Sequence, residues 1–273
     1  MARHCPATCS YCHLRSFETR CSRERLRTEN SAALMPHFFS EIFGRIESNK
    51  RDMFGRVEVL SRDPWIVSID NFLFNQEASA LIDNAVEWGR SAVLGDSEDG
   101  VESDSRTSTS GWCWSQCQTH PYVKNILRKV SRTASVHHNN FEPIQVLHYG
   151  PGEKYNVHHD ARPSEETLPS GLRVFSWLLY LNDVEEGGDT HFPGAGVTVK
   201  PKKGRAIIWP NVLDADPYTV DNRTIHEAKP VVRGEKYAAN VWIRMYDYVE
   251  AMRWDCIRPV TDDYDNRDVA WKG

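Results

Sequence analysis

The chain has 273 residues, 40% of them hydrophobic, which is enough for one substantial domain with a buried core and a leader. Its formal net charge of −5 argues against a nucleic-acid binder of the basic-patch kind. The longest apolar run, 174–181, contains Ser176 and is far shorter than the about 20 residues that a membrane-spanning helix needs.

The first predicted elements lie in the N-terminal third of the chain. Residues 1 to about 60 are rich in Arg, Ser and Glu, so we expect a leader with one short helix at 38–46. The alternating, β-branched stretch 65–72 predicts a strand. Apolar residues at helical spacing predict a helix over 75–89, with Asn75 as its candidate cap.

The rest of the chain predicts a β-rich domain. An acidic, Ser- and Gly-rich segment, 91–110, is expected to be a long functional or disordered loop, and a helix is expected over 121–135. From residue 142 onward, short strands separated by turn residues are predicted at 144–149, 155–159, 174–181, 197–199, 206–209 and 237–246. This pattern favours an α+β fold in which N-terminal helices support a double-stranded β-helix, or jelly roll.

A metal site is predicted from the triplet His158-His159-Asp160 and from His226 in the strand-like stretch 224–228. Residues two apart on a strand point to one face, so His158 and Asp160 can bind one metal while His159 points away. The register also leaves His159 open as the ligand. Two histidines and one carboxylate with free coordination positions suit Fe(II) oxygen chemistry. For the triplet alone, a surface or hydrogen-bonded pair is the alternative.

Lys236 follows ten residues after His226 and opens an apolar strand. A cation inside a barrel is costly unless it is paired, and a dicarboxylate cosubstrate would supply the partner charge. The alternative is that Lys236 sits at a strand end in solvent.

Three segments together resemble the prolyl 4-hydroxylases. They are YGPGEKYNVHHD from Tyr149, LYLNDVEEGGDTHFP from Leu179, and TIHEAKPVVRGEKY from Thr224, the last followed by Trp242-Ile243. The similarity runs with gaps from about residue 65 to 246, and the three motifs occur in the right order, which is more specific than any one of them.

The resemblance implies a role for each matching residue. His158, Asp160 and His226 would bind Fe(II), Lys236 and Tyr149 would hold the distal carboxylate of 2-oxoglutarate, and Thr190 would lie nearby. The residues expected to line a peptide groove are Tyr155, Arg173, Trp242 and Arg106, the last in an Arg-Thr-Ser stretch on the long loop. On residue type alone, core packing is an equal alternative for Trp242.

The chain departs from the family pattern at three positions. Tyr237 replaces the commoner Trp after the lysine, Arg244 stands where a His often follows Trp-Ile, and Ser176 replaces a Thr. The Arg244 change puts substrate contacts there in doubt. None of the three is expected to touch the iron or cosubstrate ligands.

The implied reaction is hydroxylation of a peptidyl proline, coupled to oxidation of 2-oxoglutarate by O2 to succinate and CO2, with L-ascorbate as the expected reductant. Proline-rich segments adopt polyproline II, which an aromatic groove binds at low ordering cost. Alternatives are the same chemistry on lysine or a small molecule, or an inactive jelly-roll binding module. A nucleic-acid demethylase is disfavoured by the acidic charge balance.

The seven cysteines fall into three groups: Cys5, Cys9 and Cys12; Cys113 and Cys117; and the isolated Cys21 and Cys256. Zinc binding and disulfides are both open. A four-ligand zinc site, however, needs a second group of Cys or His ligands, and none is near in the sequence. We therefore expect disulfides, including a small loop closed by Cys113 and Cys117, for which two buried thiols are the alternative. Because seven is odd, at least one thiol lacks a partner.

The stretch HCPATCSYC, from His4, resembles the last third of a ShKT domain. The expected organisation is a partial ShKT-like segment at 1–20, a leader at 21–62, the dioxygenase domain at 63–250 and a tail at 251–273. With the glycosylation sequon at Asn222, the cysteines point to the secretory pathway, above all the endoplasmic reticulum, with the cytoplasm as the alternative.

Overall fold

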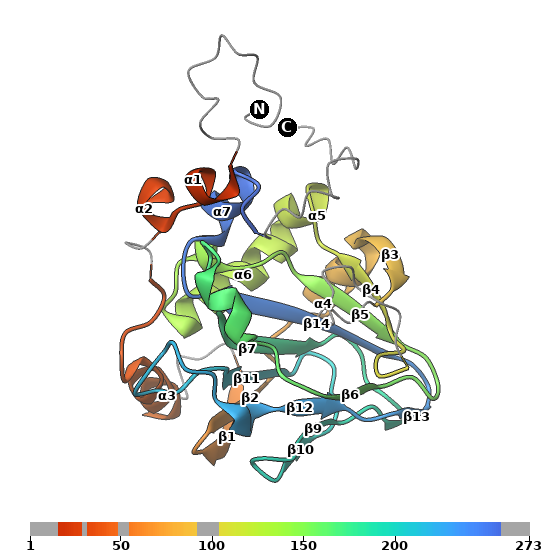
Figure 1. The fold of residues 1–273 in the computed structure, drawn as a ribbon. Helices are drawn as coiled ribbons and strands as arrows, with labels where there is room; N and C mark the ends of the chain where they lie inside the picture. Colours follow the sequence, from red (N-terminus) through yellow and green to blue (C-terminus); the bar gives the residue numbers. More distant parts are fainter. Residues whose placement is uncertain (1–15, 29–31, 49–54, 92–103, 258–273) are drawn as a thin grey trace.

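The computed structural model describes residues 16–28, 32–48, 55–91 and 104–257, in which a large and a small β-sheet face each other (Figure 1). The large sheet has eight strands in the order β1 (Arg56–Arg62), β2 (Trp65–Asp70), β11 (Ala206–Pro210), β7 (Arg173–Tyr180), β14 (Lys236–Arg244), β5 (Gln145–Tyr149), β4 (Thr109–Trp112) and β3 (Val86–Arg90). The small sheet has the order β10 (Val197–Val199), β9 (Thr190–Phe192), β12 (His226–Ala228) and β6 (Tyr155–His158). A two-stranded ribbon pairs β8 (Glu186–Gly187) with β13 (Val231–Arg233). The predicted α+β jelly roll is confirmed.

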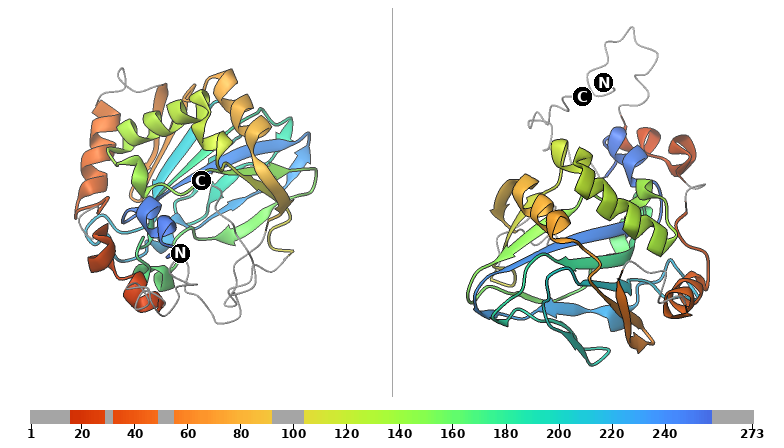
Figure 2. Two further views of the ribbon diagram at one scale, coloured as in Figure 1. Left: turned by 90° about the horizontal axis from the view of Figure 1, so that it is seen from above. Right: turned by 180° about the vertical axis from the view of Figure 1, so that it is seen from behind.

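The helices α3 (Phe38–Ser48), α4 (Asn75–Asn84) and α6 (Pro121–Ala134) pack beside the large sheet, and α4 and α6 lie across its outer face (Figure 2). Alternation along β14 divides the side chains between the two faces: Val241 and Ile243 join the core shared with the helices, whereas Ala238 joins the core between the sheets. Lys236 and Trp242 have the parity of Ala238, so the strand directs them into the barrel. No helix among the described residues is long and apolar enough to cross a membrane.

The helix predicted over 75–89 is wrong in its second half. The helix α4 ends at Asn84, and residues from Val86 form the edge strand β3. Asn75 is not the cap: the Glu77 carboxylate accepts a hydrogen bond of 2.7 Å from the backbone N–H of Phe74, and it also forms a buried ion pair with Lys129 of α6. The residues after Asn84 pair with β4 in the large sheet, a contact that sequence periodicity does not report.

The segment predicted as a leader contributes to the domain. The strand β1 pairs with β2, and α3 buries Phe39 and Phe43 in the main core. Two further short helices, α1 (Phe17–Arg20) and α2 (Arg23–Leu26), pack near the C-terminal helix α7 (Tyr248–Arg253). The remaining short helices are α5 (Gln116–Thr119) and the 3-10 turns η4 (His138–Asn140), η5 (Pro163–Thr167) and η6 (Asn222–Thr224).

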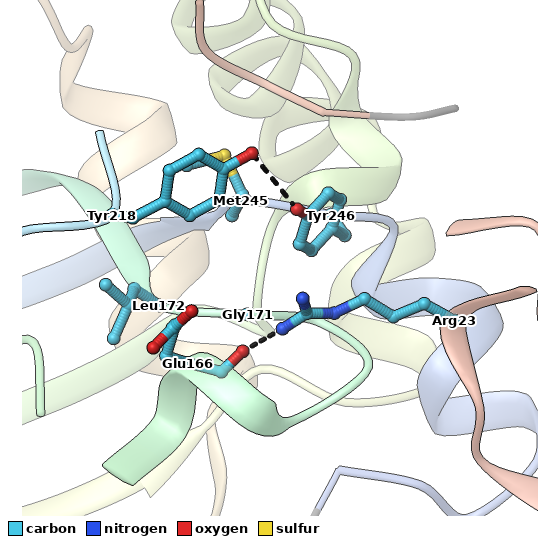
Figure 3. Close-up of a pocket in the computed structure, with 7 residues that line it drawn as sticks. All are labelled: Arg23, Glu166, Gly171, Leu172, Tyr218, Met245 and Tyr246. Atoms are coloured by element: carbon cyan, nitrogen blue, oxygen red, sulfur yellow. Dashed lines mark hydrogen bonds between the residues drawn. The ribbon is translucent and has the colours of Figure 1, made fainter. Parts of the chain in front are cut away.

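Two disulfides close the described part of the chain. The predicted Cys113–Cys117 loop is present, and the two cysteines regarded as isolated, Cys21 and Cys256, are joined across 235 residues of sequence. Nearby, Arg23 donates to the carbonyl oxygen of Glu166 and lies over the ring of Tyr246, 4.6 Å from its centroid (Figure 3). It also donates to the carbonyl oxygen of Leu168 across 3.0 Å. Residues 1–15 of the predicted ShKT-like segment at 1–20, including the stretch from His4 to Cys12 that carries the resemblance, lie outside the described residues.

Candidate metal centre

Strand pairing within the small sheet brings the predicted metal ligands together. His226 on β12 is the direct partner of His158 on β6, and their ring centroids lie 4.3 Å apart. Asp160 follows β6 by two residues, so its Oδ1 atom lies 3.9 Å from His158 Nε2 and 3.8 Å from His226 Nε2. The three side chains form a group that could hold a metal, with all ligand atoms within 4.8 Å of one another.

The backbone fixes which imidazole nitrogen faces the site. His158 Nδ1 lies 2.8 Å from the carbonyl oxygen of Asn156, and His226 Nδ1 lies 3.1 Å from that of Thr224. A carbonyl oxygen only accepts, so each Nδ1 carries the proton and each Nε2 keeps its lone pair. This is the tautomer that a metal-binding histidine needs.

Electrostatics agrees with this protonation pattern. Burial and the neighbouring His226 lower the pKa of His158 to about 3, and burial also lowers the pKa of His226. Burial acts to raise the pKa of Asp160, but the two imidazoles and a hydrogen bond from Ser176 hold it well below its usual range. At neutral pH the site therefore presents two neutral imidazoles and one carboxylate, which is the donor set that suits Fe(II).

His159 does not join the group. Its Nδ1 accepts a hydrogen bond of 2.9 Å from the backbone N–H of Ala161, and its Nε2 donates to the carbonyl oxygen of Asp221 across 3.0 Å. The structure therefore favours His158 over the alternative register in which His159 is the ligand.

Aromatic side chains enclose the two imidazoles. The ring of Tyr155 stacks on His158 with centroids 3.6 Å apart, and Trp209 and Phe192 pack against His226 at 4.8 Å and 5.5 Å. Such a wall limits water around the metal position and fixes the orientation of the rings.

Lys236 lies inside the barrel, not at a strand end in solvent. It is 1% exposed, and its Nζ donates to the carbonyl oxygen of Gly188 across 2.7 Å. Gly188 has φ +71°, and a Cβ atom there would lie 3.3 Å from Lys236 Cδ, so glycine permits this close approach. No carboxylate of the described residues is within ion-pair distance of Nζ, and burial lowers the pKa of Lys236 to about 7. A buried ammonium group without an anionic partner fits the carboxylate of 2-oxoglutarate.

Two tyrosines flank this ammonium group. Tyr149 is the direct strand partner of Lys236, and the Nζ atom lies 5.1 Å from its ring centroid and 5.5 Å from that of Tyr180. Thr190 contacts one of these tyrosines: its hydroxyl oxygen lies 2.7 Å from that of Tyr180, within hydrogen-bond distance. Tyr180 was present in the YLND motif but received no role from the sequence.

Two of the predicted substrate residues, Arg106 and Tyr155, pack against each other. The guanidinium carbon of Arg106 lies 4.6 Å from the ring centroid of Tyr155. The backbones of the same two residues form an isolated antiparallel β-bridge. Arg106 also donates to Gln145 across 3.2 Å. This arrangement connects the far end of the long loop to the wall of the metal site.

Arg173 and Trp242 form a second part of the wall. The Arg173 guanidinium stacks on the indole of Trp242 at 3.7 Å, and it donates to Glu142 through Nε and Nη2 across 2.6 Å and 2.8 Å. Arg244 stands where related sequences often have a His. It donates to the same Glu142 carboxylate across 2.6 Å and to Glu165 of η5 across 2.9 Å. Glu142 is therefore the shared anionic partner of both arginines, a role that no motif in its local sequence marks.

One expectation about Ser176 is wrong. We expected this residue not to touch the iron ligands, but its hydroxyl donates to Asp160 Oδ2 across 2.6 Å. The contact depends on β7 running beneath the site, which local sequence does not reveal.

Comparison with known proteins identifies the class. Residues 144–244 match the family model described as the 2OG-Fe(II) oxygenase superfamily. The chain is 33% identical over 212 residues to "Probable prolyl 4-hydroxylase 3" of Arabidopsis thaliana, covering 70% of this chain and 73% of that one. It is 34% identical over 204 residues to prolyl 4-hydroxylase 1 of the same plant, with 68% and 71% covered.

A solved structure agrees with the sequence relatives. The 2OG complex of the viral collagen prolyl hydroxylase from Paramecium Bursaria Chlorella virus-1 superimposes with a TM-score of 0.52 at 32% identity, covering 66% of this chain and 95% of that chain. Fold and site thus define a 2-oxoglutarate-dependent Fe(II) dioxygenase. Within that class, the chain belongs to the prolyl 4-hydroxylase family.

Proposed function

We propose that the protein hydroxylates proline in an extended, proline-rich peptide, with His158, Asp160 and His226 as the Fe(II) ligands and Lys236 as the partner of 2-oxoglutarate. One observation carries the assignment: two imidazole Nε2 atoms and a carboxylate oxygen converge in a barrel that also buries an unpaired ammonium group. When bound, Fe(II) supplies activation of O2 coupled to oxidation of 2-oxoglutarate to succinate and CO2, and L-ascorbate is the proposed reductant.

The protein's own groups bind and orient. Asn156 and Thr224 hold the two imidazoles through their carbonyl oxygens, so the lone pairs stay directed at the metal position. Lys236 and Tyr149 would bind the distal carboxylate of the cosubstrate at the far end of the pocket, with Thr190 and Tyr180 beside them. No residue needs to act as a general base.

The peptide would lie along the wall formed by Tyr155, Arg106, Trp242 and Arg173. Aromatic faces suit proline rings in a polyproline II segment. Hydroxylation of lysine or of a small molecule uses the same metal chemistry and is the second candidate.

We further propose that the protein acts in the secretory pathway, in the endoplasmic reticulum. The Cys21–Cys256 and Cys113–Cys117 disulfides support this proposal because disulfides persist in oxidising compartments.

The test is succinate formation from 2-oxoglutarate with Fe(II) and ascorbate, with and without a proline-rich peptide. We compare the wild type with His158→Ala and with His191→Ala, a control on β9 whose imidazole bonds to Val197 and Thr198 and not to the metal group. Peptide-stimulated turnover that His158→Ala abolishes and His191→Ala retains is expected.

Two other outcomes carry different meanings. Turnover that does not respond to peptide would keep the cofactor assignment and contradict the prolyl substrate. A folded, metal-loaded protein with neither turnover nor 2-oxoglutarate binding would overturn the enzyme assignment.

A further inference from the structure

A relay of two buried hydrogen bonds ends on the carboxylate of the metal group. Asn211 Nδ2 donates to Ser176 Oγ across 2.7 Å, and Ser176 Oγ donates to Asp160 Oδ2 across 2.6 Å. Asp160 is 9% exposed, Ser176 1% and Asn211 0%. The three residues come from different parts of the chain: Asp160 follows β6 by two residues, Ser176 lies within β7, and Asn211 directly follows β11.

Chemistry fixes the direction of this relay. An ionised carboxylate only accepts hydrogen bonds, so Ser176 must spend its single hydroxyl proton on Asp160. Its oxygen is then left as an acceptor, and the atom of Asn211 that faces it must be the amide nitrogen. The backbone of Asn211 is held on both sides, because its N–H donates to Val174 and its carbonyl oxygen accepts from Asp221, each across 2.9 Å.

The relay divides the two oxygens of Asp160. Oδ2 is engaged by Ser176, whereas Oδ1 lies 3.9 Å and 3.8 Å from the Nε2 atoms of His158 and His226. Asn211 Oδ1 is buried without a hydrogen-bond partner among the described residues, which is a cost to stability. Such a cost is expected at a functional site rather than in an ordinary core.

We infer that Ser176, oriented by Asn211, is a positioning residue that makes Asp160 bind the metal through Oδ1 alone. This inference rests on the proposed metal site. Two imidazoles and one oxygen leave half of an octahedral shell open, enough for a chelating cosubstrate and O2. A carboxylate free to bind through both oxygens would take one of those positions.

The test measures Co(II) binding and the visible absorption spectrum of the Co(II) protein for the wild type and five variants, one of which, His158→Ala, removes a proposed metal ligand. Ser176→Ala removes the donor, Ser176→Thr keeps a hydroxyl, and Asn211→Asp replaces the amide donor by an acceptor of the same shape. Ser170→Ala is the matched control, because Ser170 is equally buried and its hydroxyl has no partner in the described part of the chain. Thermal unfolding confirms that each variant folds.

We expect Ser176→Ala to weaken Co(II) binding about 10- to 100-fold, the range typical for loss of an outer-sphere partner, and to change the Co(II) spectrum. Asn211→Asp should act in the same direction, while Ser176→Thr and Ser170→Ala should retain both affinity and spectrum. A Ser176→Ala protein with wild-type affinity and spectrum, in which His158→Ala still abolishes binding, would overturn the inference and leave the proposed function intact. Equal Co(II) binding by the wild type and His158→Ala would instead contradict the metal site itself.

Discussion

The Nζ atom of Lys236 lies 2.7 Å from the carbonyl oxygen of Gly188 and 5.1 Å and 5.5 Å from the ring centroids of Tyr149 and Tyr180, and no described carboxylate is within ion-pair distance of it. The barrel thus holds a buried cation that only the more distant Asp189 opposes, and a bound anion would pair with it directly. Lys236→Ala should therefore raise the KM for 2-oxoglutarate at least tenfold, since a charge-assisted contact contributes about 1.5–3 kcal/mol. Steady-state succinate assays at varied 2-oxoglutarate check this, and an unchanged KM would show that the dicarboxylate binds elsewhere.

Cosubstrate affinity should depend on pH through the same group. Burial lowers the pKa of Lys236 to about 7, so above pH 7 the free protein increasingly holds a neutral amine that must gain a proton before it pairs with a carboxylate. The Kd for 2-oxoglutarate should rise between pH 7 and pH 9 by up to about tenfold per pH unit. Titration calorimetry with the Co(II) protein measures it. Lys236→Arg remains charged and serves as the control, and a wild-type Kd that is flat over this range contradicts the prediction.

Glu142 should stabilise the fold in a pH-dependent way. Burial alone would raise the pKa of Glu142, but Arg173 and Arg244 lower it to about 2. Because the folded pKa is below the unfolded value near 4.5, this stabilisation is present above pH 4.5 and is lost as pH falls toward 2. Glu142→Gln should lower the free energy of unfolding by about 3 kcal/mol at pH 7 and by less at pH 3.5.

Urea unfolding at the two pH values measures this difference. Glu186→Gln, at a side chain that is 56% exposed, is the matched control and should change little. An equal loss for Glu142→Gln at both pH values would mean that packing, and not the ion pairs, accounts for it.

Arg106 should contribute to peptide binding without affecting the cosubstrate. Its planar guanidinium both stacks on Tyr155 and donates to Gln145, which a lysine ammonium cannot reproduce. We expect Arg106→Lys to raise the KM for a proline-rich peptide about 3- to 10-fold, equivalent to about 0.6–1.4 kcal/mol, and to leave the KM for 2-oxoglutarate unchanged. Arg62→Lys, at a side chain that is 64% exposed, is the control. A parallel rise in both KM values would assign Arg106 to the pocket as a whole.

The two disulfides should differ in their effect on stability. Cys21 and Cys256 close a loop of 235 residues, whereas Cys113 and Cys117 are four residues apart. Because chain entropy lost by the unfolded state grows with loop length, Cys21→Ser/Cys256→Ser should cost on the order of 2–5 kcal/mol and more than Cys113→Ser/Cys117→Ser. Chemical denaturation of both double variants under oxidising conditions compares them, and the reverse order would be inconsistent with the loop-length account.

The sequence by itself determined the features that depend on local periodicity and on motifs. The spacing of His158 and Asp160 places both side chains on one face of a strand, because side chains alternate along an extended chain. The helix over 121–135 and the strands from residue 144 onward followed from the same kind of regularity, and they appear as α6 and the jelly roll within a residue or two. Motif order supplied His226 and Lys236.

Tertiary structure alone decided which distant residues meet. The pairing of β12 with β6 sets His226 opposite His158, and the passage of β7 and β11 beneath the site brings Ser176 and Asn211 to Asp160. The early end of α4 and the Cys21–Cys256 bond have the same origin. Such contacts join residues dozens to hundreds of positions apart, and they depend on strand register and packing, which no local pattern in the chain encodes.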